Sequence, residues 1–281
     1  MTIDLHIHST ISDGTMSPSE IVAFAAQKGI SAISITDHDS VDGVGEAIDT
    51  GKILGVEVIS GVELSVRYKN NSTHLLGYLF DHNSAALQQA LGLLQEGRIT
   101  RNREIICRLN NLGIPILYPE LLKIAGPGES GRPHIAQLLI HKKVVRTMDE
   151  AFEKYLGHGA KAYVPRFIYD AAEAIALFKD AGGLSVLAHP VQLGNTVDSF
   201  QDLLLDLVDM GLDGIEAYYP SHSRQFRKQL MVFAKQHGLL LTGGSDFHGS
   251  IRPGTTLAGG KNVSVPEHLL GIMKQRKKAV S

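Results

Sequence analysis

Residues 3–36 read IDLHIHSTISDGTMSPSEIVAFAAQKGISAISIT and open an alternating pattern of strands and helices. Residues 3–7 and 31–36 are short runs rich in β-branched side chains, which predict two strands. The segment between them has the start and stop signals of a helix: an N-cap serine, a proline in the first turn, a glutamate three residues after the cap and a terminating glycine (Ser17, Pro18, Glu20 and Gly29). This strand-helix-strand order is typical of a parallel sheet or barrel.

The same alternation extends over most of the chain. Further strands are expected at 56–66, 74–80, 184–188, 214–218 and 239–242, and further helices at 44–54, 169–181, 199–210 and 223–237. About seven strands with helices between them predict an α/β fold of the TIM-like barrel type. The barrel is expected to be distorted, because an eighth repeat is not found.

Residues 86–163 interrupt this alternation. Helical patterns follow one another there without an intervening strand, at 98–112, 119–125, 133–141 and 148–156. We therefore expect two parts: a barrel formed by residues 1–85 and 164–281, and a helical insertion, residues 86–163, that covers the active site.

The composition excludes several classes of protein. With 281 residues, 43% hydrophobic and 20% charged, the chain has the composition of a soluble globular protein, and its net charge of −2 gives no global attraction for nucleic acid or membranes. The chain has no apolar run of membrane-spanning length and no signal peptide, so we expect a cytoplasmic protein. The single Cys107 excludes an internal disulfide and a thiolate metal cage.

The thirteen histidines are the unusual feature of the composition. His6 and His8 occupy alternate positions of the first strand, so both imidazoles project from one face, together with Asp4. At the carboxyl end of a barrel strand, this arrangement suits two ligands of one cation.

More imidazoles and carboxylates stand at other predicted strand ends: Asp37, His38 and Asp39; Glu63; His189; and Asp246 with His248. Barrel enzymes place their catalytic groups at this rim. Nitrogen and oxygen ligands without thiolate favour manganese, zinc or iron. The set predicts a site with more than one metal, in which Glu63 could bridge two ions, whereas Asp37 and Asp39 could instead cap the following helix.

At these residues the chain resembles the PHP family, the polymerase and histidinol phosphatase superfamily of metal-dependent phosphoesterases. The shared motifs are DLHIH at 4–8, SDG at 12–14, TDHD at 36–39, GVE at 61–63, HLLGY at 74–78, HP at 189–190 and GSDFH at 244–248. The resemblance implies a distorted (β/α)₇ barrel with up to three metals at its rim. It assigns His6, His8, Glu63 and Asp246 to the first metal, Glu63, His74 and His189 to the second, and Asp13, His38 and His248 to the third. Some family members carry histidine where Asp13 stands.

The chain is most similar to the bacterial PHP subgroup that acts on nucleotides. This implies a phosphoesterase that removes the 3′-phosphate of nucleoside 3′,5′-bisphosphates or acts on short oligonucleotides, with two or three divalent ions: Mn²⁺ first, Zn²⁺ or Fe²⁺ as alternatives. The expected nucleophile is a metal-bridging hydroxide. Alternatives are a 5′-3′ exoribonuclease on longer RNA, a histidinol-phosphatase-like metabolite phosphatase, or a metal-binding regulatory module without activity.

The expected substrate contacts come from three segments. In GESGRPH at 128–134, Arg132 and His134 stand at a helix start and suit phosphate binding, although His134 could simply cap that helix. Arg166 is a second candidate clamp. After a later strand, Tyr219 and Ser221 could contact substrate and His222 could be the acid, or a helix cap. Basic residues 98, 101, 103 and 108 are interpreted as a solvated helix face, with a polyanion path as the alternative. The expected partner is a phosphorylated nucleotide or short oligonucleotide, with no obligate protein partner.

Overall fold

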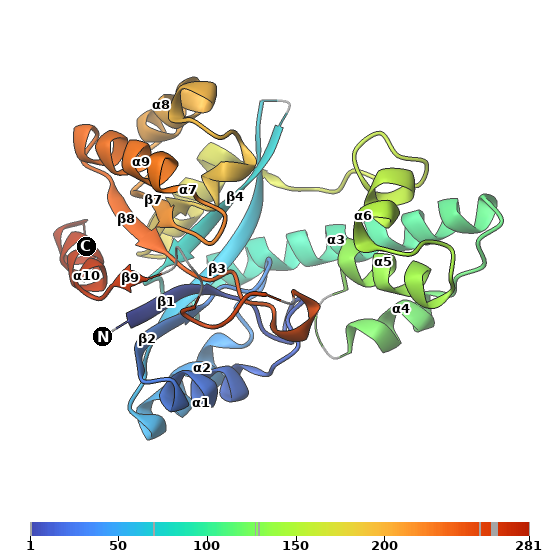
Figure 1. The fold of residues 1–281 in the computed structure, drawn as a ribbon, viewed down its shortest axis with the longest axis horizontal. Helices are drawn as coiled ribbons and strands as arrows, with labels where there is room; N and C mark the ends of the chain where they lie inside the picture. Colours follow the sequence, from blue (N-terminus) through green and yellow to red (C-terminus); the bar gives the residue numbers. More distant parts are fainter. Residues whose placement is uncertain are drawn as a thin grey trace.

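The computed structural model describes residues 2–69, 71–126, 128, 130–252, 254–259 and 264–280. Its strands form one sheet in the order β8-β7-β6-β4-β3-β2-β1-β9, with β5 paired to β3 (Figure 1). Their bounds are β1 (Thr2–Ile7), β2 (Ile30–Ile35), β3 (Glu57–Tyr68), β4 (Asn71–Tyr78), β5 (Tyr169–Asp170), β6 (Leu184–Leu187), β7 (Gly214–Tyr218), β8 (Leu240–Gly243) and β9 (Val265–Pro266).

The sheet curls into a nearly closed barrel. After β8 the chain continues alongside the end of β1, where the Asp246 N–H donates to the His6 carbonyl (2.8 Å) and the His8 N–H donates to the Phe247 carbonyl (2.9 Å). This confirms the expected distorted barrel. It also brings the segment after β8 directly beside the histidines of β1.

One strand runs against the expected direction. β1, β2 and β3 pair in parallel, as do β6, β7 and β8, but β4 is antiparallel to both β3 and β6. An all-parallel barrel is therefore wrong at this point, because β3 and β4 form a hairpin whose connection is too short for a crossover helix. As a result His74, opposite Ser65 in the first half of β4, lies near the end of the barrel where the parallel strands finish.

Several helices lie around the barrel, and a separate group of helices stands to one side of it (Figure 1). Their bounds are α1 (Pro18–Gln27), α2 (Val44–Leu54), α3 (Ala85–Asn111), α4 (Tyr118–Ala125), α5 (Arg132–His141), α6 (Met148–Ala151) continued by a π-helical turn (Phe152–Leu156), α7 (Ala171–Asp180), α8 (Gln201–Asp209), α9 (Arg224–Gln236) and α10 (His268–Val280). The capping box of α1 is present as predicted, with Ser17 and Glu20 each accepting from the other's backbone N–H. Among the described helices, none combines the length and apolar run needed to cross a membrane.

α10 and β9 were not predicted, and they close the far end of the barrel. Leu269, Leu270 and Met273 of α10 belong to the apolar cluster inside the barrel, together with Ile3 and Val265. β9 pairs with the first residues of β1, so α10 lies at the amino end of the parallel strands. The carboxyl end remains for the polar residues.

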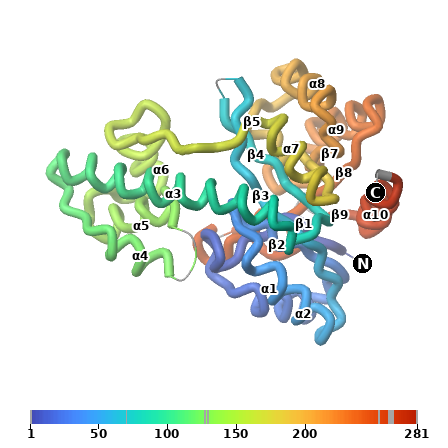
Figure 2. The backbone as a smooth tube through the Cα atoms, turned by 180° about the vertical axis from the view of Figure 1, so that it is seen from behind, coloured from blue at the N-terminus to red at the C-terminus, as the bar shows by residue number. Residues whose placement is uncertain are grey.

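α3 starts thirteen residues earlier than the predicted 98–112 and joins two apolar clusters. Its first half packs on the barrel through Leu87, Leu91 and Leu94. Its second half, including Ile105 and Leu109, packs with α4, α5 and the residues that follow. Burial of this first half outweighs the low helix propensity of its glycines. Figure 2 shows α3 running from the barrel to the helices around α4 and α5.

Candidate metal centre and the adjoining pocket

Asp4 and His6 of β1, and His8 directly after it, are all buried. The Asp4 carboxylate accepts from the Ser245 N–H (2.9 Å), the Ser245 hydroxyl (2.6 Å) and the Ala258 N–H (2.7 Å). Burial raises the pKa of Asp4, while these hydrogen bonds act in the opposite direction. Asp4 therefore ties β1 to the segment after β8, and the two imidazoles above it face the rim.

Glu63 lies at the middle of a ring of imidazoles. Its side chain is 1% exposed, and both carboxylate oxygens face nitrogen atoms. Oε1 is 2.8 Å from one nitrogen each of His74 and His189. Oε2 is 3.1, 3.2 and 3.4 Å from nitrogens of His38, His8 and His6, respectively. A carboxylate with both oxygens engaged in this way has the geometry to bridge two cations.

Asp13 and Asp246 extend this cluster on two sides. Asp13 Oδ1 is 3.4 Å from His248 Nε2 and 3.7 Å from His8 Nδ1, and its Oδ2 is 3.9 Å from His38 Nε2. Asp246 Oδ1 is 3.3 Å from His8 Nε2. The structure thus brings together all nine residues that the sequence indicated as metal ligands: His6, His8, Asp13, His38, Glu63, His74, His189, Asp246 and His248.

The chemistry of this cluster fits divalent metal ions. Among the described residues, His6 Nε2, both nitrogens of His8 and His38 Nδ1 are buried without a hydrogen-bond partner. Buried polar atoms of this kind cost free energy unless something else pairs with them. Imidazole nitrogens beside carboxylate oxygens are the ligand set of zinc, manganese and iron.

The carboxylates of the cluster keep their negative charge. Burial opposes ionisation, yet the surrounding imidazoles hold the pKa values of Asp13, Glu63 and Asp246 well below the usual range. Conversely, Glu216, Glu63 and Asp246 raise the pKa of His6 well above its ordinary value despite burial. Without metal, His6 therefore keeps its proton over most of the pH range, and a metal has to displace that proton.

Two carboxylates outside the nine clustered residues hold this cluster in place, and one of them, Glu216, was not predicted. Glu216 Oε1 is 2.9 Å from His6 Nδ1, and Glu216 Oε2 accepts from the His189 N–H (2.7 Å). Asp37 accepts from the N–H and the hydroxyl of Ser9 and from the hydroxyl of Ser12, in the loop that leads to Asp13. A buried acidic residue on the apolar strand GIEAY was the signal for Glu216. Asp37 and Asp39 do not cap α2, whose N-cap is Gly43.

The backbone is strained at this rim. Asp39, His189 and Asp246 have positive φ angles of 57°, 27° and 51°. Non-glycine residues rarely adopt this region, and where they do, it is often at a functional site. Each of the three follows the end of a barrel strand, so the strained backbone lies at the positions that orient these side chains.

A cavity of about 440 Å³ opens beside the cluster. Asp13, His38 and His74 line one part of it, and the β3–β4 hairpin contributes Ser65 and Ser72. Arginines from several segments also line it, next to apolar side chains such as Phe152 and Val164: Arg98 and Arg101 of α3, Arg132 at the start of α5, Arg166 from the connection back to β5 and Arg252 after β8. One cavity therefore joins the metal-ligand cluster to a group of arginines.

Arg98, Arg101, Arg132 and Arg166 are called the arginine cluster below. Arg98 and Arg166 (2.8 Å) both donate to Asp39 Oδ2. Arg101 is 6% exposed and donates to Asn102 Oδ1 (3.0 and 3.3 Å). Burial and the neighbouring guanidiniums lower the pKa of Arg101. The predicted solvated helix face is wrong for Arg98 and Arg101, and holds for the exposed Arg103 and Arg108.

Of the other four predicted substrate residues, one contacts the metal-ligand cluster. His134 caps α5 by accepting from the Gly131 N–H (3.0 Å), and Tyr219 donates to Asp246 Oδ2 (2.8 Å). Ser221 is exposed. His222 is buried, its Nδ1 is 2.9 Å from the Ala217 carbonyl, and burial lowers its pKa. These four are absent from the described lining of the cavity, which does contain Arg132 and Arg166. Glu129 of the GESGRPH segment lies outside the described residues.

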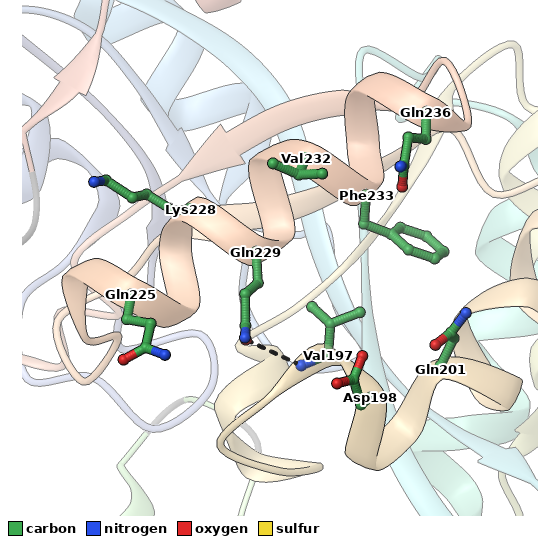
Figure 3. Close-up of a pocket in the computed structure, with 9 residues that line it drawn as sticks. All are labelled: Val197, Asp198, Gln201, Gln225, Lys228, Gln229, Val232, Phe233 and Gln236. Atoms are coloured by element: carbon green, nitrogen blue, oxygen red, sulfur yellow. Dashed lines mark hydrogen bonds between the residues drawn. The ribbon is translucent and has the colours of Figure 1, made fainter.

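A second groove, of about 480 Å³, lies on the outer surface of the barrel along α9 (Figure 3). Its described lining is mostly amide and aliphatic: Val197, Asp198, Gln201, Gln225, Lys228, Gln229, Val232, Phe233 and Gln236. It contains none of the nine candidate ligands. The cavity at the barrel rim is slightly smaller, but its lining combines candidate metal ligands with arginines.

Comparison with known proteins agrees with this geometry. A 5′-3′ exoribonuclease of Haemophilus influenzae is 33% identical over 97% of this chain and 98% of its own length. A 3′,5′-nucleoside bisphosphate phosphatase of Chromobacterium violaceum is 33% identical over 97% of this chain and 94% of its own. The crystal structure of a protein from Bifidobacterium adolescentis described as a metal-dependent phosphoesterase superposes with a TM-score of 0.86 at 28% identity, covering 98% of this chain and 96% of that one.

The PHP domain family matches residues 4–164, a stretch that contains six of the nine clustered residues. Together with relatives that extend over nearly the whole length, this match shows that the chain belongs to the PHP domain family and is a metal-dependent phosphoesterase.

Proposed function

We propose that the protein hydrolyses the 3′-phosphate ester of a nucleotide that also carries a 5′-phosphate. The observation that carries this proposal is the single cavity that joins the metal-ligand cluster to the arginine cluster. A nucleoside 3′,5′-bisphosphate and the first nucleotide of a 5′-phosphorylated RNA share this arrangement of two phosphates. The names of the two relatives, a bisphosphate phosphatase and a 5′-3′ exoribonuclease, support the same substrate pattern.

The proposed metal ligands are the nine clustered residues. Glu63 would be shared between a first ion with His6, His8 and Asp246 and a second with His74 and His189. Asp13, His38 and His248 would hold a third. We propose Mn²⁺ first and Zn²⁺ or Fe²⁺ as alternatives, since all three accept mixed imidazole and carboxylate ligands. Bound divalent ions supply Lewis acidity, which lowers the pKa of water and stabilises charge on phosphoryl and leaving oxygens.

The protein's own groups then bind and orient the substrate. Guanidinium groups in a partly buried cavity bind a phosphate strongly, because water screens them little. A 5′-phosphate held by Arg101 and Arg132 would direct the 3′-ester towards the histidines. Glu216, bonded to His6 Nδ1, keeps Nε2 of that ring facing the cluster. The lone Cys107 is exposed and absent from the described cavity lining, which agrees with hydrolysis without a cysteine nucleophile.

Product analysis tests the proposal. Mn²⁺-loaded protein is given a nucleoside 3′,5′-bisphosphate and, separately, a 5′-phosphorylated RNA tetramer. We expect the first to yield inorganic phosphate and the nucleoside 5′-monophosphate. Stepwise release of 5′-mononucleotides from the second would identify an exoribonuclease, whereas phosphate from the bisphosphate alone would identify a phosphatase. Turnover of neither would contradict the proposed substrates and favour a different metabolite or a regulatory role.

Arg132→Ala should weaken recognition of the 5′-phosphate. Loss of one charge-assisted hydrogen bond costs about 1.5–3 kcal/mol, so we expect kcat/KM for the bisphosphate to fall about 10- to 100-fold, mostly through KM. Steady-state kinetics measure this. Arg103→Ala, an exposed arginine next to the ring of Tyr118, is the matched control. An Arg132→Ala enzyme with the kinetics of the control would remove Arg132 from the site.

A further inference from the structure

We propose that Asp39 is a positioning residue for the arginine cluster: it holds Arg98 and Arg166 in one geometry and so sets how the second phosphate is bound. This inference rests on the proposed function, because it assumes a substrate with a phosphate in that cluster. Asp39 itself is absent from the described cavity lining, so it acts through the two guanidiniums.

The first argument is the backbone at Asp39. The residue follows β2 directly after His38, in the left-handed region with φ of 57°. Its N–H donates to the Glu63 carbonyl (3.0 Å), so the strained turn is attached to the residue at the middle of the metal-ligand cluster. Two consecutive side chains therefore have different partners: His38 lies against Glu63 (3.1 Å), and Asp39 pairs with the arginines.

The second argument is the convergence of distant segments on one oxygen atom. Arg98 comes from α3, and Arg166 comes from the connection that returns to the barrel 68 positions later. Both donate to Asp39 Oδ2, with Arg166 at 2.8 Å. The three side chains are 0%, 11% and 8% exposed, respectively, for Asp39, Arg98 and Arg166, so solvent screens this interaction little. One carboxylate of the barrel therefore fastens both α3 and the connection that returns to the barrel.

The third argument is charge. Arg101 and Arg132 line the same cavity, and like charges so close together repel one another. A carboxylate that lies between two of the four guanidiniums reduces this repulsion while the cavity is empty of substrate. Arg101 and Arg132, which line the cavity, are then held beside this pairing to bind a phosphate. Asp39 therefore prepares the pocket for an anion rather than occupying it.

The test compares two substrates and two variants. Asp39→Asn keeps the size of the side chain but removes its charge. Asp42→Asn, on the same loop and exposed, is the control. For each protein, kcat/KM is measured with a nucleoside 3′,5′-bisphosphate and with the nucleoside 3′-monophosphate, which lacks the second phosphate. Bound metal and the thermal unfolding midpoint are measured in parallel.

We expect Asp39→Asn to raise KM for the bisphosphate and to lower its preference over the monophosphate by at least about tenfold, with metal content retained. Asp42→Asn should keep the preference of the unmodified protein. An unchanged preference in Asp39→Asn, or an equal loss on both substrates, would overturn the inference. If the unmodified protein itself shows no preference for the bisphosphate, it is the proposed function that fails.

A second variant covers the case in which Asp39→Asn does not fold. Arg166→Lys keeps the positive charge but replaces the planar guanidinium, which alone can donate to Asp39 and a phosphate at fixed angles. We expect the same loss of preference for the bisphosphate, again with metal content retained. Full preference in Arg166→Lys would contradict the role of the Asp39 pairing.

Discussion

Replacing Glu63 by glutamine is expected to reduce kcat/KM by at least about 10³-fold, because transition-state stabilisation at a metal centre is worth several kcal/mol. Glutamine has nearly the same size but carries no charge, and Glu63 faces five imidazoles. Loss of its charge would weaken the binding of both ions that we propose it shares. Steady-state kinetics and metal analysis of the purified variant measure the two effects together.

Glu57→Gln is the matched control for this experiment. Glu57 is an exposed acidic residue at the start of the same strand, where it pairs with Lys274 of α10, at the closed end of the barrel. We expect full activity and full metal content in this variant. A Glu63→Gln protein that hydrolysed substrate as fast as Glu57→Gln would exclude Glu63 as a bridge and with it the proposed arrangement of the first two ions.

Removal of metal should abolish activity and lower the thermal unfolding midpoint. A ligand present at 100 times its dissociation constant stabilises the native state by about 2.7 kcal/mol per site. When the metal is removed, nitrogens of His6, His8 and His38 remain buried without a hydrogen-bond partner. Dialysis against a chelator, followed by calorimetry and an activity assay, tests this, and Mn²⁺ should restore both quantities.

The affinity for metal should also depend on pH, because protons and metal ions compete for the same imidazole nitrogens. Imidazoles must be neutral to bind a metal, so the affinity for metal should fall as the pH is lowered. The Glu63→Gln variant is the control for the chelation experiment. Chelation should shift its unfolding midpoint less than that of the unmodified protein. Full activity of thoroughly stripped protein would exclude a metal-dependent reaction at this site.

The barrel and much of its ligand cluster were predictable because both leave local patterns, whereas Asp13 and His74 were assigned by the resemblance to the PHP family. Alternating apolar residues indicate strands, and the carboxyl ends of parallel strands meet at one rim, so short motifs such as DLHIH and GSDFH had to lie close together. Helix α2 and strand β7 have the predicted bounds, 44–54 and 214–218. The direction of β4 was missed, because periodicity reports which face of a strand is buried and carries no information on which way it runs.

The arginine cluster was harder to predict for a different reason. The spacing of Arg98 and Arg101 places them on one face of a helix, but that spacing is equally common on a solvated surface. What decides between the two is the partner across the interface, Asp39, which is 59 positions away from Arg98 in the sequence. The role of His134 was also open from the sequence, because it stands close to Arg132 in the same segment. In the structure its ring caps α5 by accepting from the Gly131 N–H.

The continuity of α3 has a consequence for the size of the substrate. This single helix of 27 residues belongs to the apolar cluster of the barrel at one end and to that of the helical segment at the other. A continuous helix that packs in two apolar clusters resists bending between them, in contrast to the loops about which enzyme lids usually swing. We therefore expect the entrance of the cavity to change little in size and to select molecules by their cross-section before they contact the catalytic groups.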